Sequence, residues 1–242
     1  FLSLGEMDRE RGKPVADDTL FRIYSMTKPI TSIALMMLFE EGRFQLNDPV
    51  YRFLPAWRGQ QVWVQGTGED METRPPASPM TMRHILSHTA GLTYGALLPI
   101  DPHPVDAVYQ QLGVNRGEGE TIQTFADKMA QVPLRYDPGT KWLYSLATDV
   151  CGCLVEVISG QKFEDFLQQR IFEPLGMQDT AFWVPEEKVE RFSANYERAR
   201  DKSLRLIDDP QASKYLQAPS FPSGGGGLVS TTADYALSLI HI

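Results

Sequence analysis

The sequence predicts an α+β protein in which a mostly helical middle lies between strand-like ends. Apolar residues recur at helical spacing in several segments between positions 26 and 172, a period typical of amphipathic helices. Both ends instead show short segments with the alternation and turn signals of strands. We therefore expect one domain over residues 1–242, truncated at both ends, with a helical subdomain at roughly 45–190 inserted between pieces of a sheet.

The helix near residue 25 is the best-defined element. Its apolar face is made by residues at helical spacing, namely Ile30, Ile33, Ala34, Met37 and Leu38. Pro29 lacks an amide hydrogen and is tolerated only in a first turn, so the helix from about Met26 to Glu41 must begin within a residue or two of Ser25. Gly42 ends it.

The other segments are assigned in the same way. Further helices are predicted at Thr81–Ser87, 121–131, 146–159 and 163–172, with Gly160 separating the last two. Strand-like segments are predicted on both sides of a turn at Asp8–Gly12, at Leu20–Tyr24, and as a hairpin over 193–208 with its charged turn at Arg200–Lys202. A Pro-containing turn is predicted at 46–57, and exposed loops at 58–80 and 95–120.

Composition excludes several classes of protein. Of the 242 residues 42% are hydrophobic and 22% are charged, unlike collagen-like, coiled-coil or disordered chains. Lys plus Arg number 23 against 31 for Asp plus Glu, a net charge of −8. This argues against a nucleic-acid partner, which needs a basic surface. No apolar run approaches the roughly 20 residues that span a bilayer.

The ends of the sequence indicate a fragment. Position 1 is Phe, so we expect the native start to lie upstream, and both cytoplasm and periplasm stay open as compartments. The segment Thr231–Asp234 begins a helix that stops after about two turns. The closing segment Ser238–Ile242 stays open to being non-native.

A serine and a lysine three positions apart, Ser25 and Lys28, give the sharpest functional signal. At a helix start their side chains share one face, with Cβ atoms about 5–6 Å apart. Serine is a weak nucleophile until a base takes its proton, and burial near the positive end of a helix favours the neutral lysine that can take it. The helix amides would also stabilise an oxyanion on a substrate carbonyl. The alternative is an N-cap serine followed by a solvated lysine.

Two further features bear on this pair. Ser159 and Lys162 repeat the spacing, but Gly160 puts them on different elements, so we discount them. Tyr144 stands between the turn Asp137–Thr140 and a helix start, where its hydroxyl can complete a Ser–Lys–Tyr relay. The alternative for Tyr144 is an ordinary amphipathic surface tyrosine.

Cysteine and histidine give no metal signal. Cys151 and Cys153 are the only cysteines and are predicted to be small core residues, without a disulfide or a zinc site. His84 and His88 are four apart but lack the Glu of H-E-x-x-H, so we predict no metal and a capping or packing role for His88. Gly224–Gly227 lacks the ending of a phosphate loop, and we predict a close approach of backbone to backbone or to substrate.

Together these segments resemble the serine β-lactamase and penicillin-binding-protein superfamily, and most closely its β-lactamase-related carboxylesterases (family VIII esterases). The matching stretches occur in family order and cover most of residues 20–235, namely Phe21–Ile30, His84–Leu92, Pro138–Ser145, Ile171–Met177 and Ser223–Leu228. The resemblance implies a β-lactamase/transpeptidase-like α+β fold. In that fold an antiparallel sheet, incomplete here, is flanked by helices, and the site lies between the sheet and a mostly helical subdomain.

The resemblance also implies roles for individual residues. Ser25 would be the nucleophile, Lys28 and Tyr144 would share the general-base and general-acid duties, and the Ser25 amide would supply half of the oxyanion hole. The reaction would be two-step acyl transfer, in which water attacks an acyl-enzyme. It needs only side chains and water, so no cofactor and no metal is implied.

Two departures narrow the function. Relatives active on β-lactams usually carry Asn two positions after the tyrosine, and here Leu146 takes that place, which favours simple esters. The third family motif, Lys-Thr-Gly or a variant, would lie beyond residue 242, so the fragment itself is expected to lack the second oxyanion donor and activity.

We therefore predict a serine hydrolase, a carboxylesterase acting on short-chain acyl esters. Its partner would be a small-molecule ester or amide, with no nucleic acid and no membrane span, and its oligomeric state has no signature. The alternatives are a β-lactamase or D-Ala-D-Ala carboxypeptidase of the same fold, and a catalytically inactive penicillin-recognising binding or scaffold protein. A metalloprotease based on His84 and His88 is a more remote alternative.

Overall fold

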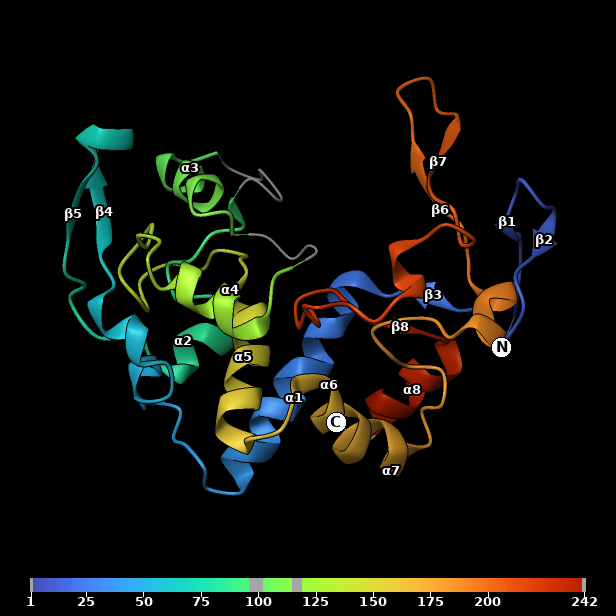
Figure 1. Cartoon of the computed structure of the whole chain (residues 1–242), viewed down its shortest axis with the longest axis horizontal. Coiled ribbons are helices and arrows are strands. Elements are labelled where there is room, and N and C mark those ends of the chain that lie inside the picture. Colours follow the sequence, from blue (N-terminus) through green and yellow to red (C-terminus); the bar gives the residue numbers. More distant parts are fainter. Residues whose placement is uncertain (1, 96–101, 115–118, 241–242) are drawn as a thin grey trace.

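A computed structural model of the chain describes residues 2–95, 102–114 and 119–240 (Figure 1). Helices α1 to α8 span, in chain order, Thr27–Glu40, Met82–Leu86, Pro104–Gln111, Ile122–Met129, Ala147–Ser159, Phe163–Leu167, Glu173–Leu175 and Thr232–Ile240. Strands β1 to β8 span Glu6–Asp8, Lys13–Pro14, Phe21–Arg22, Val62–Gln65, Glu72–Arg74, Asn195–Arg198, Leu204–Asp208 and Val229–Ser230. The mixture of helices and antiparallel strands confirms the predicted α+β class.

Helix α5 is the centre of the helical part. Every residue from Ala147 to Val155 is buried, as expected for a helix that is enclosed by others. Helix α1 lies along it, and α2, α4 and α6 also pack against it (Figure 1). Gly152 allows α6 to come close, because a Cβ at this position would lie 3.2 Å from the ring of Phe163. The starts of α1 and α5 are thereby held in fixed relation.

The strands of the described residues pair as four separate two-stranded antiparallel sheets, β1–β2, β3–β8, β4–β5 and β6–β7. In the β3–β8 pair, Phe21 lies opposite Ser230 and Arg22 lies opposite Val229. Strand β3 leads into α1, and the glycine-rich segment 224–227 precedes β8. This pairing therefore brings the glycine-rich segment next to the first turn of α1.

Most of the predicted elements are confirmed. The helix expected from about residue 26 is α1, preceded by a 3-10 turn over Tyr24–Met26. The hairpin expected over 193–208 is β6–β7, and the turn Asp8–Gly12 joins β1 to β2. The helix expected over 163–172 begins as α6 and continues as a π-helical turn at Gln168–Phe172. Cys151 and Cys153 are buried and unbridged, which confirms their assignment to the core.

The prediction of an exposed loop over 58–80 is wrong. The segment contains the hairpin β4–β5, in which Val62 lies opposite Arg74. The strands are short and β5 is exposed along its whole length, so neither carries an apolar period that the sequence could reveal.

The loop predicted over 95–120 is also wrong where the chain is described. It contains α3, which starts with Pro104 and is capped by His103, whose Nδ1 accepts from the Val105 amide at 3.3 Å. Residues 96–101 and 115–118 lie outside the described residues. The division into a helical subdomain at roughly 45–190 stays a prediction.

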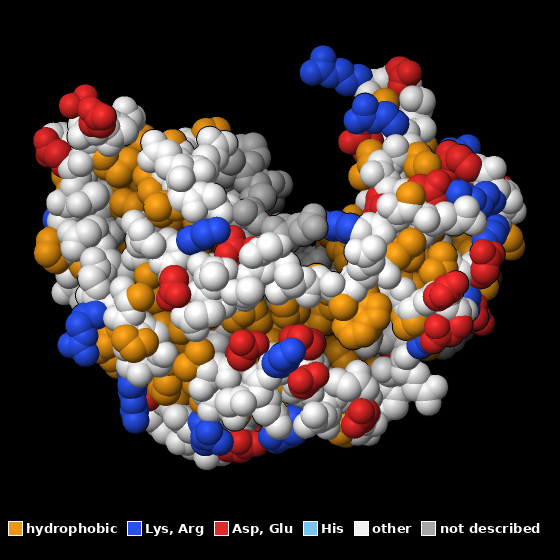
Figure 2. Space-filling view, viewed as in Figure 1, with side chains coloured by type: hydrophobic (Ala, Val, Ile, Leu, Met, Phe, Trp, Pro, Cys, Tyr) orange, Lys and Arg blue, Asp and Glu red, His pale blue; other side chains and the backbone are white. Residues whose placement is uncertain are grey.

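The face shown in Figure 2 is hollowed between the part that carries α3 and β4–β5 and the projecting hairpin β6–β7. Within the described ranges, none of the helices has the length and apolar character needed to cross a bilayer.

Candidate active site

Ser25 lies in the 3-10 turn that joins β3 to α1. The backbone enters this turn through Tyr24, whose φ of 43° is unusual for a residue other than glycine. The Met26 amide donates to the Ile23 carbonyl at 2.9 Å and closes the turn around Ser25. The N-cap of α1 is Met26 and has no side-chain cap. The alternative interpretation of Ser25 as an N-cap serine is therefore wrong.

The Lys28 side chain is buried, with 9% exposure, beside Ser25. Its Nζ donates to Ser25 Oγ at 3.1 Å, to Tyr94 Oη at 3.2 Å and to the Gly225 carbonyl at 2.5 Å. These acceptors account for the three protons of an ammonium group. The alternative of a solvated lysine is wrong as well.

Tyr144 completes the predicted cluster. Its hydroxyl donates to Ser25 Oγ at 2.7 Å, and its ring stacks on Tyr94 with centroids 5.2 Å apart. Lys28 Nζ lies 4.7 Å from the centre of the Tyr144 ring. Burial raises the pKa of Tyr144, but hydrogen bonding to Lys28 and Ser25 and the charge of Lys28 outweigh it, so that the pKa is lowered. The structure thus brings together all three residues predicted from the sequence.

The glycine-rich segment 224–227 positions the Gly225 carbonyl that accepts a hydrogen bond from Lys28. The Gly225 amide donates to Asp149 Oδ1 at 3.0 Å, and Ser223 Oγ donates to the same oxygen at 2.5 Å. A Cβ on Gly225 would lie 2.4 Å from Asp149 Oδ2, so a larger residue there would displace the carboxylate that holds the segment. The predicted close approach of backbone to backbone is confirmed at Gly224, where a Cβ would lie 2.8 Å from the Thr148 carbonyl oxygen at the start of α5.

His88 supports Tyr144 from the side. Its Nδ1 lies 3.2 Å from Ser145 Oγ, its Nε2 lies 3.4 Å from Thr148 Oγ1, and its ring centre is 5.1 Å from that of Tyr144. Burial, with a contribution from the charge of Lys28, lowers the pKa of His88 to about 4. His88 is therefore neutral at pH 7, and the predicted packing role is confirmed.

His84 serves a different element. Its Nδ1 accepts from the Thr81 amide at 3.2 Å and closes a capping box at the start of α2. Each histidine thus has its own protein partners. In the part of the chain that the structure describes, no three His, Cys, Asp or Glu side chains gather where they could hold a metal ion.

The structure also separates the discounted residues from the site. Gly160 is left-handed, and Ser159 Oγ accepts from the Gln161 amide at 3.1 Å, so Ser159 and Lys162 share no helix face. Leu146 is fully buried at the start of α5 and offers no polar group to a substrate.

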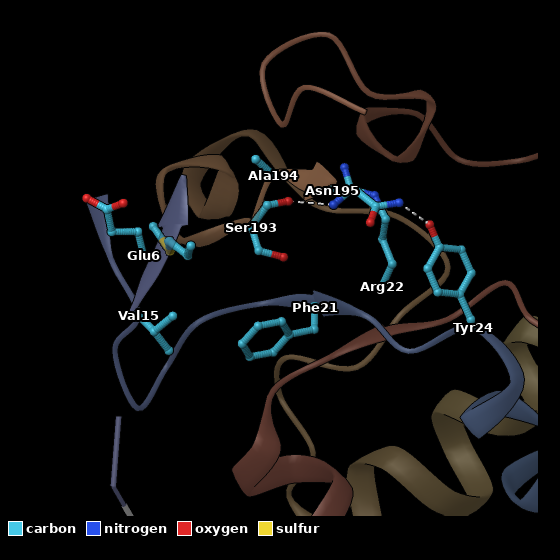
Figure 3. A pocket seen from close by; sticks show the side chains of 9 residues that line it. Glu6, Val15, Phe21, Arg22, Tyr24, Ser193, Ala194 and Asn195 are labelled. Carbon is cyan, nitrogen blue, oxygen red and sulfur yellow. Dashed lines mark hydrogen bonds between the residues drawn. The ribbon is translucent and has the colours of Figure 1, made fainter. Parts of the chain in front are cut away.

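A pocket of about 180 Å³ lies beside Tyr24, between the β1–β2 hairpin, β3 and the start of β6 (Figure 3). At its edge Asn195 Nδ2 donates to Tyr24 Oη at 2.6 Å, and Arg22 donates to the Ser193 carbonyl at 2.5 Å. Because Tyr24 directly precedes Ser25, the contact with Asn195 ties the base of hairpin β6–β7 to the turn that carries the serine.

Sequence reasoning missed three members of the cluster. Tyr94 and the Gly225 carbonyl accept from Lys28, and Asp149 holds Gly225 in place. Only the glycine-rich run signalled one of them, since neither an isolated tyrosine nor an aspartate in a helix forms a pattern.

A Ser-x-x-Lys sequence that leads into a helix, and a tyrosine hydrogen-bonded to that serine, are typical of the superfamily of serine β-lactamases and penicillin-binding proteins. The chain matches the Beta-lactamase family over residues 1–239 and belongs to it. It is 32% identical over 254 residues to esterase EstB of Burkholderia gladioli, covering 97% of this chain and 60% of that protein. It is 31% identical over 235 residues to the monacolin J acid methylbutanoyltransferase of Aspergillus terreus, covering 94% and 53%.

A solved structure gives the same result for the fold. EstCE1, described as a hydrolase with promiscuous acyltransferase activity, superimposes with a TM-score of 0.76 at 30% identity, over 96% of this chain and 61% of that one. The chain spans about half the length of the curated relatives it matches.

Proposed function

We propose that this chain carries the nucleophile and base of a serine hydrolase that cleaves short-chain carboxylic esters of small molecules through an acyl-enzyme. The observation that carries the proposal is the position of Ser25 Oγ, 2.7 Å from Tyr144 Oη and 3.1 Å from Lys28 Nζ. A nucleophile within hydrogen-bond reach of its base, with a further group orienting that base, is the arrangement that nucleophilic catalysis requires.

Tyr144 is the base in this scheme. Lys28 Nζ donates to three oxygens, so it has no lone pair that could accept the proton of Ser25. Its charge instead lowers the pKa of Tyr144. The phenolate takes the proton from Ser25 Oγ while this oxygen bonds to the ester carbonyl carbon. The same proton then passes from Tyr144 to the leaving alkoxide as the bond between carbonyl carbon and alkoxide oxygen breaks, which leaves acyl-Ser25 and a free alcohol.

In deacylation the same proton transfers occur in reverse order, with water in place of the alcohol. Tyr144 takes a proton from the attacking water, the tetrahedral intermediate collapses, and the proton returns to Ser25 Oγ as the acid is released. The Ser25 amide, in the 3-10 turn that leads into α1, stabilises the oxyanion in both steps. A second donor from a strand beyond residue 242 remains a prediction.

The position two residues after Tyr144 favours esters over β-lactams. Leu146 occupies it and is buried in the core, so this position provides no amide to bind a lactam side chain. The similarity to esterase EstB also supports an ester substrate.

Acyl transfer to an alcohol is a second candidate. It uses the same acyl-enzyme, with an alcohol in place of water, and the similarity to a methylbutanoyltransferase favours it. Adding an alcohol to the assay and measuring the new ester against the free acid distinguishes transfer from hydrolysis.

The proposal is tested by treating the full-length protein with a fluorophosphonate probe and mapping the adduct by peptide mass spectrometry. We expect labelling at Ser25, loss of the label and of p-nitrophenyl butyrate hydrolysis in Ser25→Ala, and no change in Ser159→Ala, the matched serine of the other Ser-x-x-Lys. Hydrolysis by Ser25→Ala at the parent rate would refute the assignment.

The same preparation separates the alternatives. Faster turnover of a chromogenic cephalosporin than of the butyrate ester would indicate a β-lactamase or peptidase. Binding of penicillin without labelling or turnover would indicate an inactive relative. A stoichiometric metal ion in the purified protein would favour the metalloprotease alternative.

A further inference from the structure

Trp142 is an exposed aromatic residue that lies beside Tyr144 and His88. Its side chain is 66% exposed, although its ring centre lies 6.3 Å from that of Tyr144, with the two planes only 26° apart. It also lies 6.3 Å from the His88 ring in an edge contact. An aromatic surface of this size left open beside the catalytic cluster is available to a substrate.

The backbone that carries Trp142 is anchored on both sides. The Gly139 amide donates to the Thr89 carbonyl at 2.8 Å, and the Leu143 amide donates to the His88 carbonyl at 2.8 Å. Trp142 therefore sits on a fixed segment between two hydrogen bonds rather than on a free loop. Binding a substrate against it costs little ordering of the protein.

The position of Tyr144 decides which part of an ester meets Trp142. Tyr144 Oη must hand its proton to the alkoxide oxygen, so this oxygen lies within hydrogen-bond reach of Tyr144. Groups attached to that oxygen therefore start beside Tyr144, whose ring neighbours are His88, Tyr94 and Trp142. Of these, Tyr94 is buried at 7% exposure, whereas Trp142 is open.

We infer that Trp142 forms the binding surface for the alcohol part of the ester, and that it favours alcohols with an aromatic or flat apolar group. This inference rests on the proposed function. The inference predicts different effects on the two steps of the reaction, because the alcohol has left before water attacks the acyl-enzyme. Trp142 thus acts on acylation and not on hydrolysis of the acyl-enzyme.

The test compares two acetate esters in the full-length protein, 2-naphthyl acetate and methyl acetate, which form the same acetyl-enzyme. In Trp142→Ala we expect kcat/KM for 2-naphthyl acetate to fall roughly 3- to 10-fold, the range of one aromatic contact. For methyl acetate it should stay within about twofold, and the single-turnover rate constant for loss of the acetyl group should not change. Trp142→Phe should restore most of the preference.

Control variants distinguish a failure of this inference from a failure of the proposed function. Trp183→Ala removes another exposed tryptophan, outside the contacts of the Ser25 cluster, and should leave both esters unaffected. Equal losses for both esters, or slower loss of the acetyl group, would overturn the inference in favour of a structural role or an acyl subsite. Unchanged constants with Ser25 still labelled by the fluorophosphonate would overturn the inference alone. Absence of that label in the parent protein would overturn the proposed function and, with it, the inference.

Discussion

Replacing Tyr144 by Phe removes one oxygen atom and leaves the aromatic packing in place. The Phe ring keeps the stack on Tyr94 at 5.2 Å and the contact with His88 at 5.1 Å, and Ser25 keeps its hydrogen bond from Lys28 at 3.1 Å. The change removes the group 2.7 Å from Ser25 Oγ that would carry the proton. The substitution therefore separates proton transfer from architecture.

Tyr144→Phe should lower kcat/KM by the contribution of one general base. A positioned general base contributes roughly 10²- to 10⁴-fold, which equals about 2.7 to 5.4 kcal/mol of transition-state stabilisation. The lost hydrogen bond is solvent-exposed, so the free energy of unfolding should change by about 1 kcal/mol or less. Activity should thus fall far more than stability.

The assay is kcat/KM for p-nitrophenyl butyrate across a pH series, with urea unfolding of the same preparations. The parent rate should decline as pH falls below the pKa of Tyr144, because the phenolate is then protonated, and this limb should disappear in Tyr144→Phe. Tyr136→Phe is the matched control, since Tyr136 lies against Lys141 at 4.4 Å on the same segment. A Tyr144→Phe enzyme within twofold of the parent would show that Tyr144 is not the base.

Three further outcomes are expected from the contacts around the cluster. Gly225→Ala pushes a Cβ to 2.4 Å from Asp149, so we expect about 1–3 kcal/mol lower stability and lower kcat, with Gly59→Ala, where no atom lies within 4 Å, unaffected. The pKa of His88 falls from 6.5 to about 4 on folding, so the unfolded chain binds more protons between these values. The free energy of unfolding should therefore decrease as pH falls from 6.5 to 4, and His88→Gln should lose this dependence in urea titrations. Burial raises the pKa of Cys151 and Cys153, so iodoacetamide should modify neither thiol in the folded protein and both in urea. Intact mass measures the modification, and rapid modification without urea would mean that α5 is accessible to solvent.

The parts of the site that the sequence predicts are those encoded locally. Ser25 and Lys28 are three positions apart, and Pro29 restricts the helix start to their neighbourhood, so their shared face results from helix geometry alone. Tyr144 was found through its place in a family motif between a turn and a helix.

The parts that escape prediction depend on distant segments. Lys28 reaches Tyr94 across 66 positions and the Gly225 carbonyl across 197, and no periodicity links residues so far apart. A backbone carbonyl also has no sequence signature, because every residue has one. The hairpin β4–β5 was missed for another reason, since β5 is exposed throughout and carries no buried face to alternate.

Lys28→Met tests how the base is prepared, because Lys28 and Tyr144 are both within hydrogen-bond reach of Ser25. If Tyr144 is the base, the charge of Lys28 acts by lowering the pKa of Tyr144, and removing it must move the acidic limb of the kcat/KM profile to higher pH. The rate at pH 7 then falls, and part of it returns in alkaline buffer. Lys141→Met, on the segment that carries Tyr144, should leave the limb where it is. A limb that vanishes in Lys28→Met while persisting in Tyr144→Phe would make Lys28 the base, since a limb belongs to the group whose protonation stops the reaction.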